Sequence, residues 1–229
     1  MEYKNITEGV FIARPSRFVA NVKIGEEVEK VHVKNTGQCE RLLFEGARVF
    51  LEESSNTQRK TKYDMYAVFD ESAGVINIDA YVINEVVHDY LKSEDKVLPS
   101  EDYLQDEYDY QDATFDYYFD DGERKVAMNV CGCMNQKYGI GIYPDTDNDK
   151  DIKKVHEITD AARNGHEAYL GFVIQINSVG FVIPNRENAP DYADALRDAI
   201  KAGVKLLFWE CRVSEKEVRL HETHIIDSL

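Results

Sequence analysis

This 229-residue chain has few cysteines, only five prolines and no long apolar run, and each shortage excludes a class of protein. The four cysteines, at positions 39, 131, 133 and 211, are too few and too scattered for a disulfide framework. No stretch approaches the roughly 18 consecutive apolar residues of a membrane helix. The first ten residues lack the apolar core of a signal peptide. We therefore expect a globular cytoplasmic protein that makes no use of a membrane.

Basic side chains are also scarce, because 27 Lys and Arg face 43 Asp and Glu and leave a net charge of −16. This balance argues against a protein that coats nucleic acid. The acidity is local: residues 1–85 hold 14 acidic and 11 basic side chains, whereas Ser93–Glu123 holds twelve acidic side chains and one Lys. Two interpretations of this acidic stretch stay open. It is either a solvated loop leading into a strand, or a polyanion mimic that covers a basic surface of this chain or of a partner.

Short alternating apolar segments predict β-structure for residues 1–83. The expected strands, separated by turn residues such as Gly25, Gly46 and Gly74, are residues 18–24, 29–33, 48–52, 63–69 and 75–78. Five short strands in this length predict a small barrel, and the OB fold is the commonest choice. Such barrels often bind single-stranded nucleic acid, although a fold alone does not establish a function.

Cations gather beside aromatic residues at two places in this half, and a further lysine opens a short polar loop. Cations contact phosphates, and aromatic rings can stack on bases. The candidate nucleic-acid contacts are Arg14, Arg17, Lys34, Arg59, Lys60 and Lys62, with Phe18 and Tyr63 as the neighbouring rings. The alternative is a set of solvated loops neutralised by Glu52, Glu53 and Asp64.

Residues 84–229 predict an α/β domain with a mixed sheet. The expected strands are residues 115–119, 125–131, 138–143, 168–176, 180–183, 204–213 and 218–220. Amphipathic spacing predicts helices over residues 84–92, with Asn84 as the N-cap, and over 149–164 and 190–202.

One hairpin, Thr114 to Gly132, carries the most informative pattern. Asp116 lies on its first strand, and Asn129 and Cys131 share a face of the second, because side chains two apart project to the same side. In metal-dependent nucleases an Asp on one strand faces an acid-x-Lys pair on the next, the carboxylates hold Mg²⁺, and the Lys assists the attacking water. Here the acid and Lys positions are Asn129 and Cys131. We therefore expect a nuclease-like fold with a degenerate site.

Other chemistry has weaker support in the sequence. Cys131-x-Cys133 does not match zinc-finger spacing, and ordinary reduced cysteines are the simpler interpretation. A nucleophilic pair of Cys131 with a distant histidine stays open. His221 and His224 follow a predicted strand, and we interpret them as surface residues.

Five segments occur in an order that identifies a family resemblance. They are RPSRFVANV (14–22), HVKNTGQCERLLFEGARVFLE (32–52), RKTKYD (59–64), IYPD (142–145) and FVIPNRENAPDYADALRDAIKAGVKLLFWECRV (181–213). Together they resemble the sugar fermentation stimulation protein family of bacteria and archaea, nearly from end to end. The resemblance implies an N-terminal OB fold and a C-terminal domain like the restriction-endonuclease superfamily. It also implies binding of DNA, double- or single-stranded, with little sequence preference, and a link to the regulation of sugar utilisation.

The family pattern transfers to this chain position by position. Its first-strand Asp falls on Asp116, its Glu-Val-Lys-Gly falls on residues 129–132, and its Arg-Gly-x-Lys falls on residues 150–153. Asn129 offers a cation only an uncharged oxygen, so Mg²⁺ at Asp116 should bind with low affinity. Asp145 is a second candidate metal ligand, although Asp after Pro at a strand end is also common turn chemistry. The surviving cations, Lys150 and Lys153, are further candidate phosphate contacts.

Three functions follow from these observations. The first is a DNA-binding protein without nuclease activity. The second is a Mg²⁺-dependent nuclease whose acidic ligand has moved to Asp120, Glu123 or Asp145. The third is an acidic protein-interaction module that has lost DNA binding. Sheet edges left unpaired in such a fold also favour a homodimer.

Overall fold

The computed structural model describes residues 1–229 except 36, 38, 57, 94–95, 111–112 and 228–229. The chain forms two compact units. The first comprises Met1–Glu85, Gln175–Ser178 and Cys211–Arg219, and the second comprises Val86–Ile174, Val179–Glu210 and Leu220–Leu229. The expected domain boundary after residue 83 stays a prediction. Among the described residues, none of the helices combines the length and the apolar composition needed to cross a membrane.

The first unit contains a closed barrel, which confirms the predicted OB-type fold. Its strands are β1 (Ile6–Ser16), β2 (Val19–Ile24), β3 (Glu27–Val33), β4 (Arg48–Glu53), β5 (Tyr63–Asp70) and β6 (Gly74–Asn77). They follow the order β3-β2-β1-β4-β5-β6. A parallel pairing of β3 with β5, at His32–Asp64 and Val33–Met65, closes the barrel.

Strand β1 was not predicted, because its sequence interrupts the alternation expected of a strand. It contains Gly9 and Pro15, and its register against β2 shifts twice between Phe11 and Ser16. Gly9 lies so close to β2 that an added Cβ would come within 2.4 Å of Val22 Cγ1. The strand predicted at residues 75–78 is confirmed as β6, which pairs with β5 at the end of the sheet.

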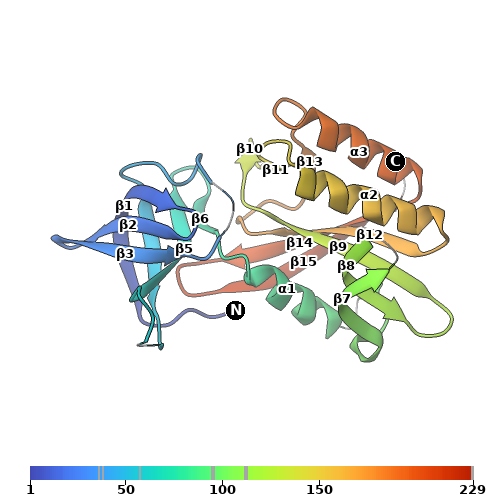
Figure 1. The fold of residues 1–229 in the computed structure, drawn as a ribbon, viewed down its shortest axis with the longest axis horizontal. Helices are drawn as coiled ribbons and strands as arrows, with labels where there is room; N and C mark the ends of the chain where they lie inside the picture. The colour runs from blue at the N-terminus through green and yellow to red at the C-terminus, as the bar shows by residue number, and fades with distance from the viewer. Residues whose placement is uncertain (36, 38, 57, 94–95, 111–112, 228–229) are drawn as a thin grey trace. The chain divides into compact units, whose positions relative to one another are not determined.

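The second unit contains a mixed six-stranded sheet, as predicted, in the order β15-β14-β12-β9-β8-β7. Its strands are β7 (Leu104–Tyr110), β8 (Ala113–Asp120), β9 (Lys125–Cys133), β12 (Glu167–Ile174), β14 (Lys205–Val213) and β15 (Val218–Ile226). Strands β9, β12 and β14 are parallel, and β7 and β8 are antiparallel to their neighbours. Helices α2 (Asp149–Arg163) and α3 (Pro190–Lys201) lie side by side over one face of this sheet (Figure 1).

A small second sheet accounts for one wrong prediction. It contains β10 (Gln136–Lys137), β11 (Ile140–Tyr143) and β13 (Val182–Pro184). The strand expected at residues 138–143 is therefore shorter than predicted and lies outside the main sheet. This strand, β11, pairs in parallel with β13, where Ile142 lies opposite Ile183.

The first helix also begins earlier than predicted. Helix α1 (Val82–Leu91) starts two residues before Asn84, so Asn84 is not its N-cap. Asp79 precedes the helix, and its Oδ1 accepts the Tyr81 N–H at 2.9 Å. The position of Asn84 before the apolar residues therefore did not locate the helix start, because the carboxylate of Asp79 accepts the backbone N–H ahead of the helix.

The acidic stretch is more ordered than the predicted loop. After a short 3₁₀ turn (Glu101–Tyr103), β7 forms an edge strand of the main sheet and pairs with β8. Tyr108 of β7 stacks on Tyr118 of β8 with ring centroids 4.2 Å apart. Aromatic cross-strand pairs of this kind stabilise a sheet, and here they hold a strand whose charged side chains face water. Residues 94–95 and 111–112 of the stretch lie outside the described residues.

One carboxylate joins the amino ends of the three parallel strands. Glu167, at the start of β12, accepts from Arg124 Nη2 at 2.7 Å, from Lys205 Nζ at 2.9 Å and from the Tyr169 hydroxyl at 2.5 Å. Burial acts to raise the pKa of Glu167, but the bonds from Tyr169, Lys205 and Arg124 outweigh it and lower the pKa to about 2. Hence Glu167 stabilises the folded state as an anion.

Replacing this carboxylate should give a pH-dependent loss of stability. A carboxyl whose pKa falls from 4.5 to about 2 on folding stabilises the protein fully above about pH 4.5, and this stability is lost as the pH falls through about 2. We expect Glu167→Gln to lower the free energy of unfolding by about 1–3 kcal/mol at pH 7, measured by urea denaturation. The deficit should shrink below pH 4.5. A deficit that is constant with pH, or one equal to that of the exposed control Glu187→Gln, would contradict this assignment.

Candidate functional site

The hairpin site lies where the β8–β9 ladder ends. Backbone pairing of these strands runs from Asp120–Lys125 to Tyr117–Met128. Beyond Tyr117–Met128, hydrogen bonds to side chains replace the backbone pairing of the two strands. The Asp116 N–H donates to Asn129 Oδ1 at 3.0 Å, and the Val130 N–H donates to Asp116 Oδ2 at 2.7 Å. Asp116 and Asn129 are thus brought together, as the hairpin pattern predicted.

Asn129 is fully buried, and both ends of its amide are used. Its Oδ1 accepts from Asp116, and its Nδ2 donates to the backbone oxygen of Lys154 in α2 at 3.0 Å. This position therefore requires one donor and one acceptor. A carboxylate only accepts, so it could not make both bonds. The amide ties β8, β9 and α2 together in a way that an acid could not.

Lys154 supplies a cation to the site. Its Nζ lies 2.6 Å from Asp116 Oδ2 and 3.1 Å from the Val130 backbone oxygen. Burial lowers the pKa of Lys154, but the charge of Asp116 outweighs burial and the net pKa is raised, so the ammonium stays charged. Oxygens of these two kinds also ligate Mg²⁺, at about 2.0–2.1 Å. A metal ion bound to them would lie close to the ammonium and be repelled by it, so the two cations compete for these oxygens.

Cys131 lies in the site as a protonated thiol. Its side chain is buried, and burial raises the pKa of the thiol to about 12. A thiol that keeps its proton at neutral pH is a poor nucleophile, which argues against the pairing of Cys131 with a histidine. The four cysteines are free and buried, which agrees with the interpretation as ordinary reduced residues.

Lys154 was missed from the sequence, whereas two nearby cations were proposed. Lys150 and Lys153 are exposed on the first turns of α2, and Lys153 pairs with Glu157 at 3.4 Å. Their contact with phosphate stays a prediction. Helical spacing carried the missing signal, because Lys154 lies directly beside Val155, the first buried residue of the helix.

Two of the proposed replacement acids, Asp120 and Glu123, lie apart from Asp116. Asp120 and Glu123 belong to the turn end of the hairpin, and Asp120 is four residues along β8, or about 13 Å, from Asp116. Asp145 follows β11, and its backbone oxygen accepts from Asn185 Nδ2 at 2.9 Å. Within the described part of the chain, no trio of His, Cys, Asp or Glu ligand atoms gathers at Asp116.

The barrel carries a second candidate site. The turn at Arg17 and Phe18 joins β1 to β2, and residues 54–62 join β4 to β5. Strands β2 and β5, which follow these two connections, begin on either side of His32 in β3: Val19 of β2 and Asp64 of β5 both pair with it. Two basic segments that are 40 residues apart in the sequence are therefore neighbours at one end of β3. Arg17 lies 5.7 Å from the Phe18 ring, and Lys62 Nζ lies 5.0 Å from the Tyr63 ring.

Three of the six predicted contacts in the barrel hold its loops. Arg14 donates to the backbone oxygens of residues 17, 35 and 37 at 2.5–2.6 Å. Lys34 pairs with the buried carboxylate of Asp79 at 2.6 Å, and Arg59 forms a two-pronged pair with Asp64 at 2.7 and 2.8 Å. Arg17, Lys60 and Lys62 are the exposed members of the set, and Lys62 makes a surface pair with Glu53 at 3.4 Å beside its contact with the Tyr63 ring.

Changing Asn129 to its isosteric acid tests the amide requirement. Asn129→Asp places a carboxylate oxygen against the Lys154 carbonyl, so we expect a loss of about 1–3 kcal/mol in the free energy of unfolding at pH 7. The loss should decrease at acidic pH, where a protonated carboxyl can donate again. Urea denaturation of this variant and of Asn56→Asp, an exposed control that keeps its acceptor role toward the Gln58 N–H, measures the effect. Equal losses in the two variants would refute the requirement.

Comparisons with known proteins agree with this architecture. Residues 12–78 match the family model described as "SfsA N-terminal OB domain", and residues 81–217 match "Sugar fermentation stimulation protein RE domain". Two relatives named sugar fermentation stimulation protein homolog come from Desulfitobacterium hafniense (strain DSM 10664 / DCB-2) and Ruminiclostridium cellulolyticum. The first is 36% identical over 95% of this chain and 94% of the relative, and the second is 34% identical over 97% of each.

A solved structure supports the same fold at lower identity. SfsA of Pyrococcus furiosus, solved in complex with Ca²⁺, superposes with a TM-score of 0.82 at 21% identity, over 97% of this chain and 96% of that one. From the two family models and the similarity to these relatives over nearly its whole length, we conclude that the chain belongs to the sugar fermentation stimulation protein family.

Proposed function

We propose that this chain binds nucleic acid through its barrel and does not cleave it. The observation that carries the binding proposal is the position of the exposed cations. OB folds bind oligonucleotides through strands 2 and 3 and through the loops that join strands 1 to 2 and 4 to 5. Arg17 lies in the first of these loops, and Lys60 and Lys62 lie in the second. The rings of Phe18 and Tyr63 add surfaces on which bases can stack.

The hairpin site supports the proposed absence of cleavage. Asn129 supplies no negative charge, Cys131 supplies no ammonium, and Lys154 already pairs with the Asp116 carboxylate. The Pyrococcus furiosus relative was solved with Ca²⁺, and for this chain we propose only weak Mg²⁺ binding at Asp116. The family name further suggests a role in regulating sugar utilisation, for which DNA binding with little sequence preference would be the physical basis.

A protein-interaction module is the second candidate function. Strand β7 is an edge strand whose acidic side chains, including Asp106 and Asp109, are exposed. Edge strands with free backbone groups can pair with another chain, and a homodimer formed in this way is part of this alternative. The acidic surface would select a basic partner protein and would repel DNA.

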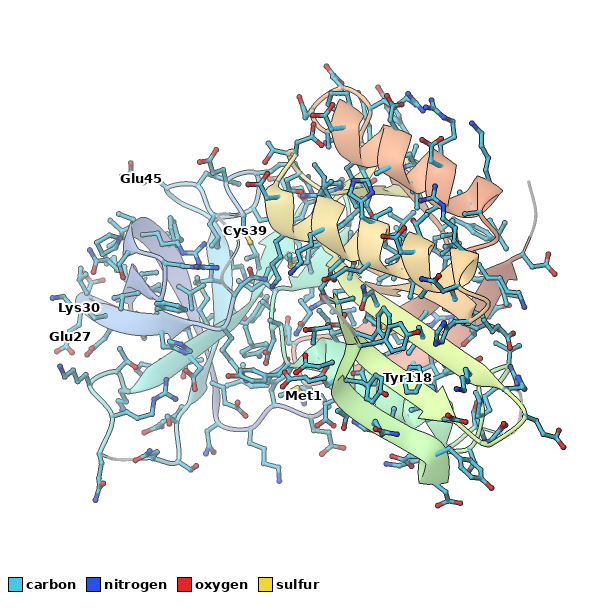
Figure 2. The ribbon with its side chains drawn as sticks, turned by 45° about the vertical axis from the view of Figure 1, so that its right-hand side comes forward. Met1, Glu27, Lys30, Cys39, Glu45 and Tyr118 are labelled. Carbon is cyan, nitrogen blue, oxygen red and sulfur yellow. The ribbon has the colours of Figure 1, made fainter. Side chains whose placement is uncertain are left out.

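The binding proposal predicts a salt-dependent affinity that depends on the two loops. We expect Arg17→Ala/Lys60→Ala to weaken binding of labelled duplex and single-stranded DNA, measured by fluorescence anisotropy across a salt titration. Each lost phosphate contact should reduce the slope of log K against log salt by about 0.9 for duplex. The matched control is Arg163→Ala/Lys201→Ala, which removes equal charge from exposed positions on α2 and α3. Strands β2 and β3, where Figure 2 labels Glu27 and Lys30, are left unchanged because they belong to the proposed binding surface. Equal effects of the two variants would refute the loop assignment, and no binding at low salt would favour the interaction module.

The same DNA, incubated with Mg²⁺ or Mn²⁺ and separated on a denaturing gel, tests the absence of cleavage. We expect intact DNA for the wild-type protein and for Asp116→Asn alike, because Asp116 performs no chemistry. Metal-dependent cleavage by the wild type that Asp116→Asn abolishes would show a working nuclease. Cleavage that persists in Asp116→Asn but is lost in Asp120→Asn or Asp145→Asn would identify a relocated acid.

A further inference from the structure

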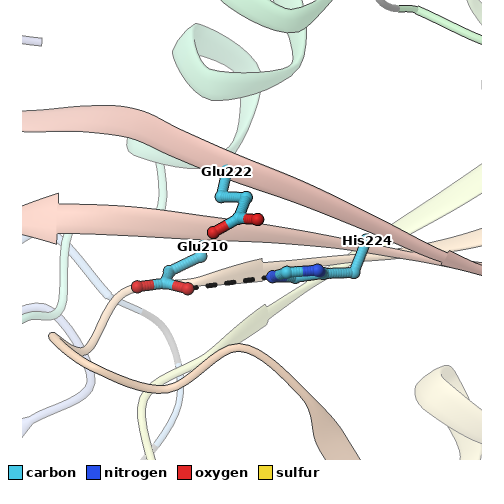
Figure 3. A group of neighbouring side chains, drawn as sticks. All are labelled: Glu210, Glu222 and His224. Atoms are coloured by element: carbon cyan, nitrogen blue, oxygen red, sulfur yellow. Dashed lines mark ion pairs between the residues drawn. The ribbon is translucent and has the colours of Figure 1, made fainter.

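Three ligand-type side chains converge on the β14–β15 hairpin, away from Asp116. Glu210 lies on β14, and Glu222 and His224 lie on β15. One carboxylate oxygen from each Glu and one imidazole nitrogen lie within 4.8 Å of one another. Figure 3 shows the three side chains projecting into a common space from the two strands.

Ion pairing accounts for only part of this arrangement, because it includes Glu210 and His224 but not Glu222. His224 Nε2 lies 3.8 Å from Glu210 Oε2, which is too long for a hydrogen bond. No Lys or Arg in the described chain pairs with Glu210 or Glu222. Two carboxylates on neighbouring strands repel each other, and the compensating charge nearest to Glu210 is that of a protonated His224 at 3.8 Å. The free-energy cost of keeping the carboxylate charged is greater for Glu210, because its side chain is only 15% exposed.

The distances suit one metal ion better than they suit direct contact. Ligands about 2.0–2.2 Å from a zinc ion lie roughly 3–4 Å apart, close to the observed 3.8 Å between Glu210 and His224. The exposed side chain of Glu222 can complete the set by a change of rotamer.

The surroundings of the cluster hold the imidazole and keep the space open. The Phe181 ring packs against His224 with ring centroids 4.9 Å apart. Gly180 borders the ligand atoms, since an added Cβ there would lie 3.3 Å from His224 Nε2 and 3.5 Å from Glu210 Oε2. A side chain at residue 180 would fill part of the space between the ligands.

The cluster is separate from the hairpin site. Strand pairing aligns Cys133, Ile174 and Glu210 across β9, β12 and β14. Aligned residues of neighbouring strands project to one side, and Asn129 and Cys131 share that side with Cys133 on β9. The cluster therefore lies on the same face of the sheet as the hairpin site. It is two strands away, on the far side of Phe172 and Phe208.

We propose that Glu210, Glu222 and His224 bind one divalent transition-metal ion of the Zn²⁺ type. Two carboxylate oxygens and one imidazole favour such an ion over Mg²⁺, which prefers oxygen ligands alone. Three protein ligands leave a coordination position for water, and the exposure of Glu222 places that position toward solvent. The ion would also link β14 to the edge strand β15.

Competition with a chromogenic Zn²⁺ chelator tests this proposal on the full chain, purified free of metal under reducing conditions. We expect one equivalent of Zn²⁺ to bind the wild type, and a large excess of Mg²⁺ not to displace it. Glu210→Gln and His224→Gln should each weaken Zn²⁺ affinity at least about 10-fold, because loss of a ligand exceeds the effect of losing an outer-sphere contact. The control His221→Gln removes a neighbouring imidazole and should bind Zn²⁺ as the wild type does.

A second measurement, made on the wild-type protein, tests the proposal even if one of the variants fails to fold. In wild-type protein labelled with ¹⁵N, the His224 imidazole signals should shift in a saturable way as Zn²⁺ is added, whereas those of His221 should not. Wild-type affinity in a folded His224→Gln variant, an unchanged His224 signal at saturation, or loss of binding in His221→Gln would each overturn the proposal.

Discussion

The buried amide of Asn129 determines the state of the hairpin site. It joins the end of the β8–β9 ladder to α2 through one accepted and one donated hydrogen bond. This contact positions Lys154, whose ammonium donates hydrogen bonds to the Asp116 carboxylate and to the Val130 carbonyl. The oxygens that could hold a metal ion thus already hold a cation from the chain itself. The amide, at a position where the family resemblance implies an acid, supplies no negative charge to the site and binds the backbone of the helix residue whose side chain reaches Asp116.

The barrel illustrates how an acidic protein can present a local basic surface. Its net charge matters less than the few cations that the loops bring to one end of β3. Arg14, Lys34 and Arg59 are satisfied by carbonyl oxygens and carboxylates, so they shape these loops. The exposed Arg17, Lys60 and Lys62 are then the residues through which a phosphate backbone would be recognised. A division of this kind between structural and exposed cations cannot be read from composition.

Local patterns in the sequence identified most of the fold. Strong signals of period, turn or cap mark the hairpin of β8 and β9 with its turn at Asp120-Asp121-Gly122, the apolar run of β12, and α3 between Pro190 and Gly203. Strand β1 was missed because it contains Gly9, a residue that is required there by the close packing of β2 and that is unusual in a strand. Strand β7 was missed because its acidic sequence suggested a loop, whereas stacking of its tyrosine on β8 stabilises it as a strand. Lys154 and His224 were missed for a related reason: their partners, Asp116 and Glu210, are distant in the sequence. His221 is exposed, as interpreted from the sequence, whereas His224 lies within β15 and its side chain is only 24% exposed.

The central claim is that Lys154 occupies the cation position at Asp116. The most direct test is a Mg²⁺ titration of ¹⁵N-labelled protein that follows the Val130 amide, because this N–H donates to Asp116 Oδ2. We expect the Val130 signal to shift at a much lower Mg²⁺ concentration in Lys154→Ala, where the ammonium is removed, than in the wild type, where Mg²⁺ binds only weakly. Half-saturation at the same Mg²⁺ concentration in both proteins would contradict the claim, because Lys154 would then not compete with Mg²⁺ for Asp116.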